Sequence, residues 1–167
     1  MSGLKIYVAG KVSKDSQFGT HYWRDYFCTE LKRLSGIKLD NLDPMRAESG
    51  LTEPDEIFAK DCRLINQADV FVVYLSDDIS VGGSQEILIA RYLRKPVIGL
   101  APLGGKFNGA RREIFGKMIE DYKDPFVFAT CDIVCATVGE VAEALKRINE
   151  IKLTGLDKID SAIDCES

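Results

Sequence analysis

The chain has little of what several common enzyme classes require. It contains a single histidine, His21, among 167 residues, and no Gly-x-Ser-x-Gly motif. A Ser-His-Asp hydrolase is therefore disfavoured, because that mechanism needs a histidine base beside an activated serine. Neither Gly-x-x-x-x-Gly-Lys-Ser/Thr nor Gly-x-Gly-x-x-Gly occurs, so the fingerprints of a P-loop and of a dinucleotide site are absent. We interpret His21 as a surface residue in the first turn of a helix.

The chain also lacks an excess of positive charge and a long apolar run. Its net charge is −4, which disfavours a nucleic-acid polymer as partner, because phosphate neutralisation takes clustered Lys and Arg. A small anionic ligand remains compatible, since a local pocket can oppose the global charge. No apolar stretch approaches the roughly 20 residues that span a bilayer. The first residues lead directly into an expected strand rather than a signal peptide. We expect no membrane partner and a cytoplasmic location.

The five cysteines are odd in number and form no Cys-x-x-Cys pair. Cys131 and Cys135 are expected on one face of a strand, but no pair of histidines stands nearby to complete a metal site. We interpret the cysteines as buried, reduced thiols of a cytosolic protein. The sequence accordingly predicts neither a metal nor a cofactor.

Strand and helix patterns alternate along the chain. The expected strands are residues 4–9, 37–39, 70–75, 96–100 and 126–129. The expected helices are residues 20–34, a helix that starts near Pro54 with Thr52 as its cap, and residues 84–93, 110–121 and 138–151. Such alternation predicts an α/β fold, a doubly wound sheet of about five mainly parallel strands with helices on both faces. Residues 1–151 would form one domain, and residues 152–167 a polar C-terminal tail.

The carboxyl ends of the strands are where such a sheet is expected to bind a ligand, near the change in strand order. Three stretches of the chain reach that edge in the predicted fold: residues 10–19, 77–86 and 102–109. The first contains Lys11 and Lys14, which either supply charge to a phosphate or are simply solvated. The second contains Gly82 and Gly83, which permit close backbone approach and offer N–H groups to an anion. A pair of glycines is, however, more often just a turn.

Asp61 interrupts the apolar stripe of the helix that starts near Pro54. The residues three and four positions away on either side are Ile57, Phe58, Leu64 and Ile65. Burying an ionised carboxylate is unfavourable unless it is paired or hydrogen-bonded, so Asp61 is a candidate functional residue. The alternative is a structural Asp that accepts hydrogen bonds from a loop or pairs with Lys60 or Arg63. The pattern places those two basic residues on other faces of the helix.

Glu86 interrupts the next helix in the same way. The apolar residues three, four and seven positions later are Ile89, Ala90 and Leu93. We expect Glu86 in the first helical turn, where the helix N-terminus would keep it ionised. An ionised, desolvated carboxylate at the ligand-binding edge is a candidate nucleophile. The alternative is a Glu that closes a capping box with Gly83 or Ser84.

Four segments together carry a resemblance to a known family. They are residues 5–10, a strand with an aromatic residue and a small-Gly turn; residues 61–73, an acidic helix leading into Ala-Asp and a strand; residues 80–86, a Gly-containing loop ending in Glu; and residues 94–98, Arg-Lys-Pro-Val-Ile. In this order and spacing they resemble the nucleoside 2-deoxyribosyltransferase family, including the related 2′-deoxynucleoside 5′-monophosphate N-glycosidases. The resemblance covers residues 4–100 and implies a flavodoxin-like fold.

The resemblance also implies roles for individual residues. Glu86 would attack the anomeric carbon, Asp61 would assist at the leaving base, and Tyr7 would orient the nucleophile. The candidate substrate-binding residues are Gly10, Lys11, Ser80, Gly82, Gly83 and Asn108, the last contributed by a neighbouring subunit. Ser80 stands where the transferases commonly have Asp or Asn, which is more like the monophosphate glycosidases. The family further implies a homodimer or a larger homo-oligomer.

The sequence thus predicts an enzyme that cleaves or transfers the N-glycosidic bond of (2′-deoxy)nucleosides or their 5′-monophosphates. The reaction would pass through a covalent glycosyl ester on Glu86. The alternative is a non-catalytic nucleotide-binding sensor on the same fold. Leu88 favours the sensor, because the family usually has a Gly there and a bulky residue near the nucleophile would block the sugar.

Overall fold

The computed structural model describes residues 3–11, 17–19, 22–46, 50–76 and 78–165. Of the residues singled out above, Lys14 and His21 lie outside these ranges. The strands of the main sheet are β1 (Leu4–Lys11), β2 (Leu39–Asn41), β3 (Val70–Leu75), β4 (Val97–Leu100) and β7 (Ile133–Cys135), and a separate hairpin consists of β5 (Asn108–Ile114) and β6 (Lys117–Lys123). The helices are α1 (Trp23–Ser35), α2 (Pro54–Gln67), α3 (Val81–Tyr92), α4 (Pro125–Thr130), α5 (Val138–Lys146) and α6 (Asp157–Asp164), with a 3-10 turn at Ile148–Glu150.

The main sheet has five strands in the order β2-β1-β3-β4-β7, and every neighbouring pair is parallel. This is the flavodoxin-like order, and the α/β fold predicted from the alternation is confirmed. Strand β3 is buried along its whole length, as a central parallel strand covered on both faces must be. The strand order reverses between β1 and β3, so the expected ligand edge lies at their carboxyl ends.

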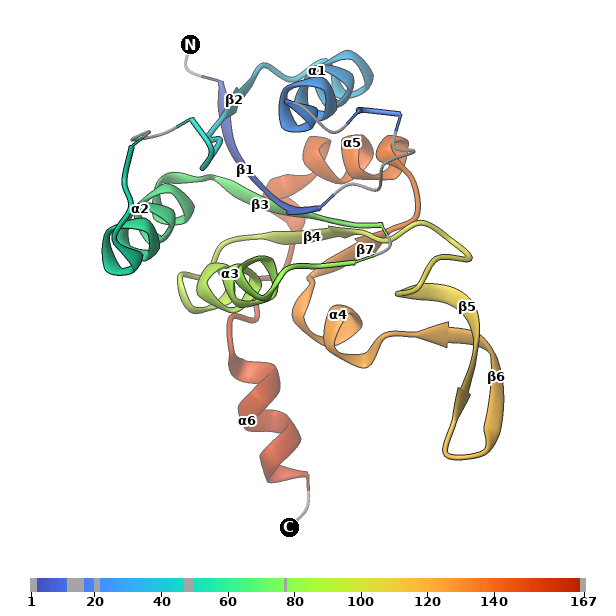
Figure 1. Cartoon of the computed structure of the whole chain (residues 1–167). Helices are drawn as coiled ribbons and strands as arrows, with labels where there is room; N and C mark the ends of the chain where they lie inside the picture. Colours follow the sequence, from blue (N-terminus) through green and yellow to red (C-terminus); the bar gives the residue numbers. More distant parts are fainter. Residues whose placement is uncertain (1–2, 12–16, 20–21, 47–49, 77, 166–167) are drawn as a thin grey trace.

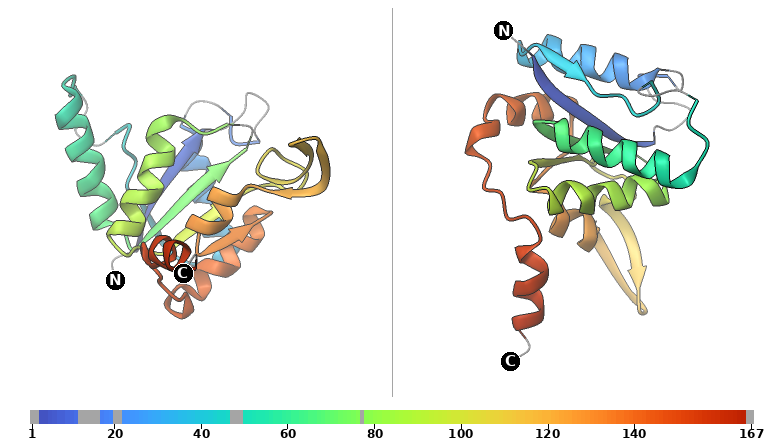
Figure 2. Two further views of the ribbon diagram at one scale, coloured as in Figure 1. Left: turned by 90° about the horizontal axis from the view of Figure 1, so that it is seen from below. Right: turned by 90° about the vertical axis from the view of Figure 1, so that its left-hand side faces the viewer.

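Helices cover both faces of the sheet (Figure 1). Helices α1 and α5 lie on one face, and α2, α3 and α4 on the other, as the view in Figure 2 also shows. Side chains alternate between these faces along each strand. In β1, Ile6 and Val8 pack under α1 and α5, whereas Tyr7 and Ala9 pack toward α2 and α3. The face that receives Tyr7 is therefore the face covered by the helices that carry Asp61 and Glu86.

Residues 108–123 form a hairpin, and the helix predicted at 110–121 is wrong. The segment is rich in helix-forming residues, but Phe115 and Gly116 both have positive φ and make the turn between the strands. The hairpin projects away from the sheet, so most of its side chains are exposed and neither face shows an apolar periodicity (Figure 1).

Residues 125–130 form helix α4, so the strand predicted at 126–129 is also wrong. The Asp124 carboxylate accepts hydrogen bonds from the N–H groups of Phe126 and Val127, and Pro125 occupies the first turn. Asp-Pro is a helix start signal, and here it outweighs the strand-like run of apolar residues that follows.

Two helix starts also differ from the prediction. Helix α3 begins at Val81, three residues earlier than expected, with Ser80 as its N-cap. Helix α2 begins at Pro54 after Glu53, without a side-chain cap, so Thr52 does not have the predicted capping role. The earlier start of α3 moves Glu86 from the first turn of the helix to the second.

The C-terminal segment contains a short helix, α6, in which no residue is buried. Figure 2 shows it extending away from the sheet. Arg91 of α3 donates to Thr154, which precedes α6, and Arg94, which follows α3, forms an ion pair with Asp157 at the start of α6. No helix among the described residues is long and apolar enough to cross a membrane.

The cysteines are all free, but only three of them are buried: Cys28, Cys131 and Cys135. Burial raises the pKa of Cys28 and Cys131 to about 12 and that of Cys135 to about 11, so these thiols are poor nucleophiles. Cys165 is exposed, contrary to the expectation of general burial. Cys131 ends α4 rather than sharing strand β7 with Cys135.

Candidate active site

The site begins at the carboxyl end of β1, where Gly10 lies against β3. Gly10 pairs with Tyr74 in the sheet and has a φ of 112°. A Cβ atom at Gly10 would lie 2.2 Å from the carbonyl oxygen of Tyr74, so no other residue fits there. Lys11 follows as the last residue of β1 and is exposed, while its carbonyl oxygen accepts a hydrogen bond from Ser76.

Tyr7 is fully buried on the face of the sheet that α2 and α3 cover. Its ring stacks on Phe71, with 5.5 Å between ring centroids and 11° between planes. Its hydroxyl oxygen is buried and has no hydrogen-bond partner at ordinary geometry. Buried hydroxyls are nearly always paired, so this group is available to a ligand or to a neighbouring carboxylate.

Asp61 lies on α2 with its side chain largely buried, as the stripe predicted. Its Oδ1 atom is buried and makes no hydrogen bond, although the Nζ atom of Lys60 is 3.4 Å away. The prediction that Lys60 faces elsewhere is wrong, because its flexible stem brings the ammonium group back to Asp61. The other half of the stripe is exposed at Ile57 and Phe58, since the first turns of α2 extend beyond the sheet.

Glu86 lies in the second turn of α3 and is half-buried. A capping box is excluded, because the N-cap is Ser80 and the residue three positions later is Gly83. The pKa of Glu86 is raised, first by burial and then by the negative charge of Asp61. Tyr7, Arg24 and Lys60 oppose this rise. The expectation that the helix N-terminus keeps Glu86 ionised stays a prediction, because Glu86 lies in the second turn and not in the first.

The structure brings Tyr7, Asp61 and Glu86 together. Burial raises the pKa of Tyr7, and the charges of Glu86 and Asp61 raise it further. Each of the three groups thus acts electrostatically on another. They come from β1, α2 and α3, three elements on one face at the carboxyl edge. Within the described residues, no group of three or more His, Cys, Asp or Glu is placed to hold a metal ion.

Two cations near these carboxylates were missed by the sequence analysis. The Nε atom of Arg24 in α1 donates to the carbonyl of Val8 at 2.8 Å, and its guanidinium lies over the ring of Trp23. Arg24 lies three residues before the buried Phe27, so the criterion that found Asp61 would also have found it. Lys60 does not interrupt the apolar stripe of its helix, so the sequence pattern did not indicate it. It is buried by the loop at Pro44, which is distant in sequence.

The N-cap and the first turn of α3 use their polar groups to start the helix. The hydroxyl of Ser80 accepts a hydrogen bond from the N–H of Gly83 at 3.0 Å. Gly83 is buried, and a Cβ atom there would lie 3.2 Å from Ile79 and 3.3 Å from the Ser80 hydroxyl, whereas Gly82 is exposed. One of the two N–H groups expected to cradle an anion is therefore already bonded within the chain.

Two further residues lie in arrangements that the sequence did not indicate. Asn108 is buried at the base of the hairpin, and its amide donates to the carbonyl of Ala101 in the same chain at 2.9 Å. That bond uses one of the two N–H groups of the amide, and the role of Asn108 in a neighbouring subunit's site stays a prediction. Leu88 lies two positions after Glu86, hence on another side of α3, where it lines a cavity with Phe126 and Thr130. It faces away from the carboxylate pair and does not obstruct it.

Comparison with known proteins gives likeness in structure alone. No protein-family model matches the sequence, and neither does any curated protein. A 2-deoxyribosyltransferase of Bacillus psychrosaccharolyticus superposes with a TM-score of 0.53 and 18% identity, over 83% of this chain and 90% of that one. A 2-deoxyribosyltransferase of Leishmania mexicana gives 0.51 and 17%, over 84% and 95%. A CMP N-glycosidase of Clostridium botulinum gives 0.47 and 13%, over 84% and 97%. The first two likenesses establish a shared fold.

Proposed function

We propose that the chain cleaves or transfers the N-glycosidic bond of (2′-deoxy)nucleosides or their 5′-monophosphates, with Glu86 as nucleophile. The observation that carries this proposal is the carboxylate pair of Glu86 and Asp61, set beside the buried hydroxyl of Tyr7, which faces Glu86. Enzymes that cleave or transfer glycosidic bonds commonly use a pair of carboxyl groups in a partly desolvated site. The fold shared with two 2-deoxyribosyltransferases supports the same reaction class.

The reaction is a double displacement. A carboxylate oxygen of Glu86 forms a bond to the anomeric carbon while the bond from that carbon to the base nitrogen breaks, through an oxocarbenium-like transition state. The base leaves with the bonding electrons and gains a proton, directly or through water, at the position of Asp61. The hydroxyl of Tyr7 donates to Glu86 and orients it. Water or a second base then attacks the anomeric carbon and releases Glu86 as a carboxylate.

The negative end of the substrate would lie near Lys11 and the start of α3. Lys11 is exposed at the end of β1, where its long side chain can reach a 5′-phosphate. The first turn of α3, with its N-cap Ser80, would lie on the other side of the substrate. The hydroxyl of Ser80 contributes mainly by fixing this helical turn, since it already accepts the hydrogen bond that starts the helix. Gly82 is exposed in the first turn of α3, where its N–H group would face the ligand.

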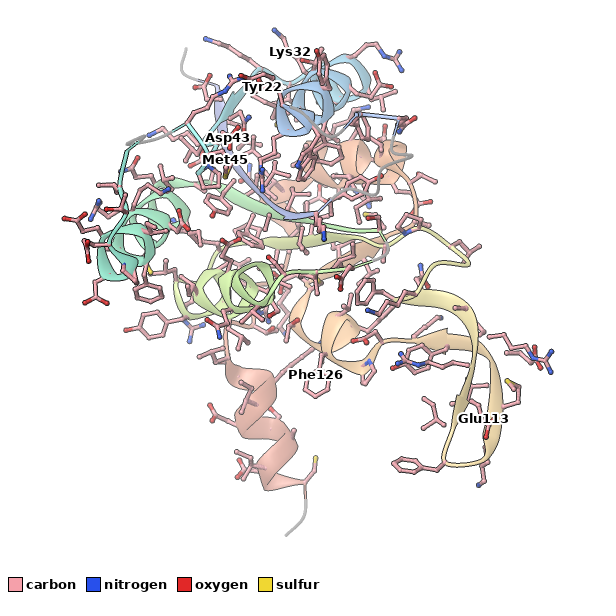
Figure 3. All side chains as sticks on the ribbon, in the orientation of Figure 1. Tyr22, Lys32, Asp43, Met45, Glu113 and Phe126 are labelled. Atoms are coloured by element: carbon pink, nitrogen blue, oxygen red, sulfur yellow. The ribbon has the colours of Figure 1, made fainter. Side chains whose placement is uncertain are left out.

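The test is a panel of deoxynucleosides and their 5′-monophosphates, incubated with and without an acceptor base while free base is followed by chromatography. Release from monophosphates alone identifies the glycosidase branch, and new nucleosides formed only with acceptor identify the transferase. Glu86→Gln should abolish either activity with the fold intact, and Glu113→Gln, on the exposed hairpin (Figure 3), is the matched control. Retained activity in Glu86→Gln excludes the proposed nucleophile. Thermal stabilisation by ligand without any product would point instead to a binding protein.

The proposal includes assembly into a homodimer or larger homo-oligomer. Large apolar side chains are exposed along α3, α4 and α6, namely Leu88, Tyr92, Phe126, Ile159 and Ile163. Phe126 projects from α4, as Figure 3 shows. Contiguous exposed apolar surface of this kind is typical of protein–protein contacts.

A further inference from the structure

Lys60 is a buried lysine beside the carboxylate pair, and the proposed reaction gives it no role so far. It is 9% exposed, and no other lysine in the described part of the chain is buried. Lysine is rarely buried without compensation, because its ammonium group loses strong hydration. The contacts of its Nζ atom therefore show which groups compensate for the lost hydration.

The Nζ atom of Lys60 has two partners in the structure. It donates to the carbonyl oxygen of Pro44 at 2.7 Å, and it lies 3.4 Å from Oδ1 of Asp61. Pro44 belongs to the loop after β2, between α1 and α2, where Figure 3 labels Asp43 and Met45. One ammonium group thus joins that loop to the carboxylate that faces the nucleophile.

The bond to Pro44 alone does not explain the pairing with Asp61. Adjacent residues on a helix point about 100° apart and do not normally face each other. Lys60 and Asp61 meet because the lysine stem folds back under the loop. The Oδ1 atom of Asp61 is buried and has no hydrogen bond, so the ammonium charge is the compensation the structure provides for it.

The charged and titratable groups that act on Glu86 come from three elements. Tyr7 comes from β1, Arg24 from α1, and Asp61 with Lys60 from α2. The two cations, Arg24 and Lys60, lower the pKa of Glu86, and Asp61 raises it. Two carboxylates in one site resist ionising together unless positive charge balances them, and here the two cations match the two carboxylates in number.

We propose, on the basis of the function proposed above, that Lys60 is a positioning residue: its buried ammonium group holds Asp61 beside Glu86 and fastens the loop at Pro44 to the same point. In this role Lys60 touches neither the sugar nor the base. It fixes the direction of the Asp61 carboxylate through Oδ1, and its charge allows Glu86 to be ionised while Asp61 is next to it.

The decisive variant is Lys60→Gln, which can still donate a hydrogen bond to the Pro44 carbonyl but carries no charge. We expect the acid limb of its kcat/KM profile to move up by roughly one pH unit, and kcat on that limb to fall about tenfold with a smaller change in KM. Lys60→Arg keeps the charge and should retain the wild-type limb. Lys95→Gln is the matched control, because Lys95 also donates to a backbone carbonyl, that of Asn66 at 2.6 Å, at the opposite edge of the sheet.

The outcomes separate this proposal from the proposed function. Inactivity of the wild-type protein on the whole panel refutes the function, whatever Lys60 does. In either case, carbon-13 NMR of the Glu86 carboxyl, assigned with Glu86→Gln, should show its titration at higher pH in Lys60→Gln than in the wild type. An unshifted midpoint, an unchanged acid limb, or an equal shift in Lys95→Gln overturns the positioning role. A folded Lys60→Arg variant with a raised limb would do so as well.

Discussion

At the scale of single residues, Glu86 couples the chemistry of the site to the stability of the fold. Its pKa in the folded protein is raised by burial and by Asp61. Ionising it therefore opposes folding, an effect that is absent below the ordinary pKa of Glu and grows as pH rises through the folded pKa. This unfavourable carboxylate fits the proposed nucleophile, which must be ionised and partly desolvated.

Glu86→Gln should consequently raise the melting temperature near pH 7 and have little effect near pH 4. The reason is that Gln removes the penalty of ionisation, which the protonated wild type does not suffer. A gain of 1 kcal/mol would appear as roughly 2–4 °C in a domain of this size. Calorimetry of both proteins across this pH range provides the measurement. A variant that is less stable than the wild type at pH 7 would show that Glu86 is stabilised by its neighbours.

Lys11 tests whether the substrate carries a phosphate. It is exposed, so Lys11→Ala should leave the melting temperature unchanged. If its ammonium group binds a 5′-phosphate, the variant should lose about tenfold or more in kcat/KM for monophosphates and little for nucleosides, in line with a charged hydrogen bond. Steady-state rates on matched substrate pairs decide this. Equal losses on both would remove Lys11 from the phosphate site.

Residue-scale reasoning from the sequence was most successful where a charge interrupts an apolar pattern. Asp61 and Glu86 were found in this way, and the structure places both on the face of the sheet that Tyr7 occupies. Lys60 was beyond that reasoning, because its burial depends on the loop at Pro44, distant in sequence. The capping role of Ser80 was not foreseen, because it depends on where α3 begins, and helix boundaries are poorly encoded in local sequence.

At the scale of elements, the N-terminus of α3 depends on one hydroxyl. Ser80→Ala removes the cap and should lower stability by about 1 kcal/mol, hence the melting temperature by a few degrees. Ser80→Asp retains a capping oxygen and should keep the melting temperature, while its negative charge repels a 5′-phosphate. Thermal melts combined with rates on monophosphates and nucleosides give both readouts. Equal rates of Ser80→Asp and the wild type on monophosphates would place the phosphate elsewhere.

The strands that are buried on both faces of the sheet were predicted well, and the exposed elements were not. The strands β1, β3 and β4 are near-continuous apolar runs, because parallel strands buried on both faces admit little else. The β5–β6 hairpin has few buried residues, so no alternation of apolar and polar residues marks its strands. Its helix-forming residues therefore favoured a helix in the prediction. In α4, Asp124-Pro125 is a recognisable helix start, but the short apolar run after it is compatible with a strand as well as with a helix.

At the scale of the whole molecule, the exposed apolar side chains on α3, α4 and α6 predict self-association. Phe126 is 79% exposed and borders a cavity of about 590 Å³ between α4 and α6. We expect the wild type to sediment as a dimer or larger, and Phe126→Asp to dissociate it, because burying an unpaired carboxylate in an interface is strongly unfavourable. Phe115→Asp, at the fully exposed hairpin tip, should leave assembly intact. Wild-type protein that sediments as a monomer would refute the prediction.

The buried guanidinium of Arg91 gives α3 a second fixed end. It binds Asp132 and Thr154, and Asp132 in turn accepts the N–H of Val97 at 2.9 Å. Helix α3 therefore begins at the Ser80 cap and ends at a network of hydrogen bonds. This network joins the helix to β4, to Asp132 just before β7 and to the C-terminal segment. We expect these segments to open together, so that their amide protons exchange with solvent at similar rates. The position of Glu86 is thus held partly by contacts at the far end of its own helix.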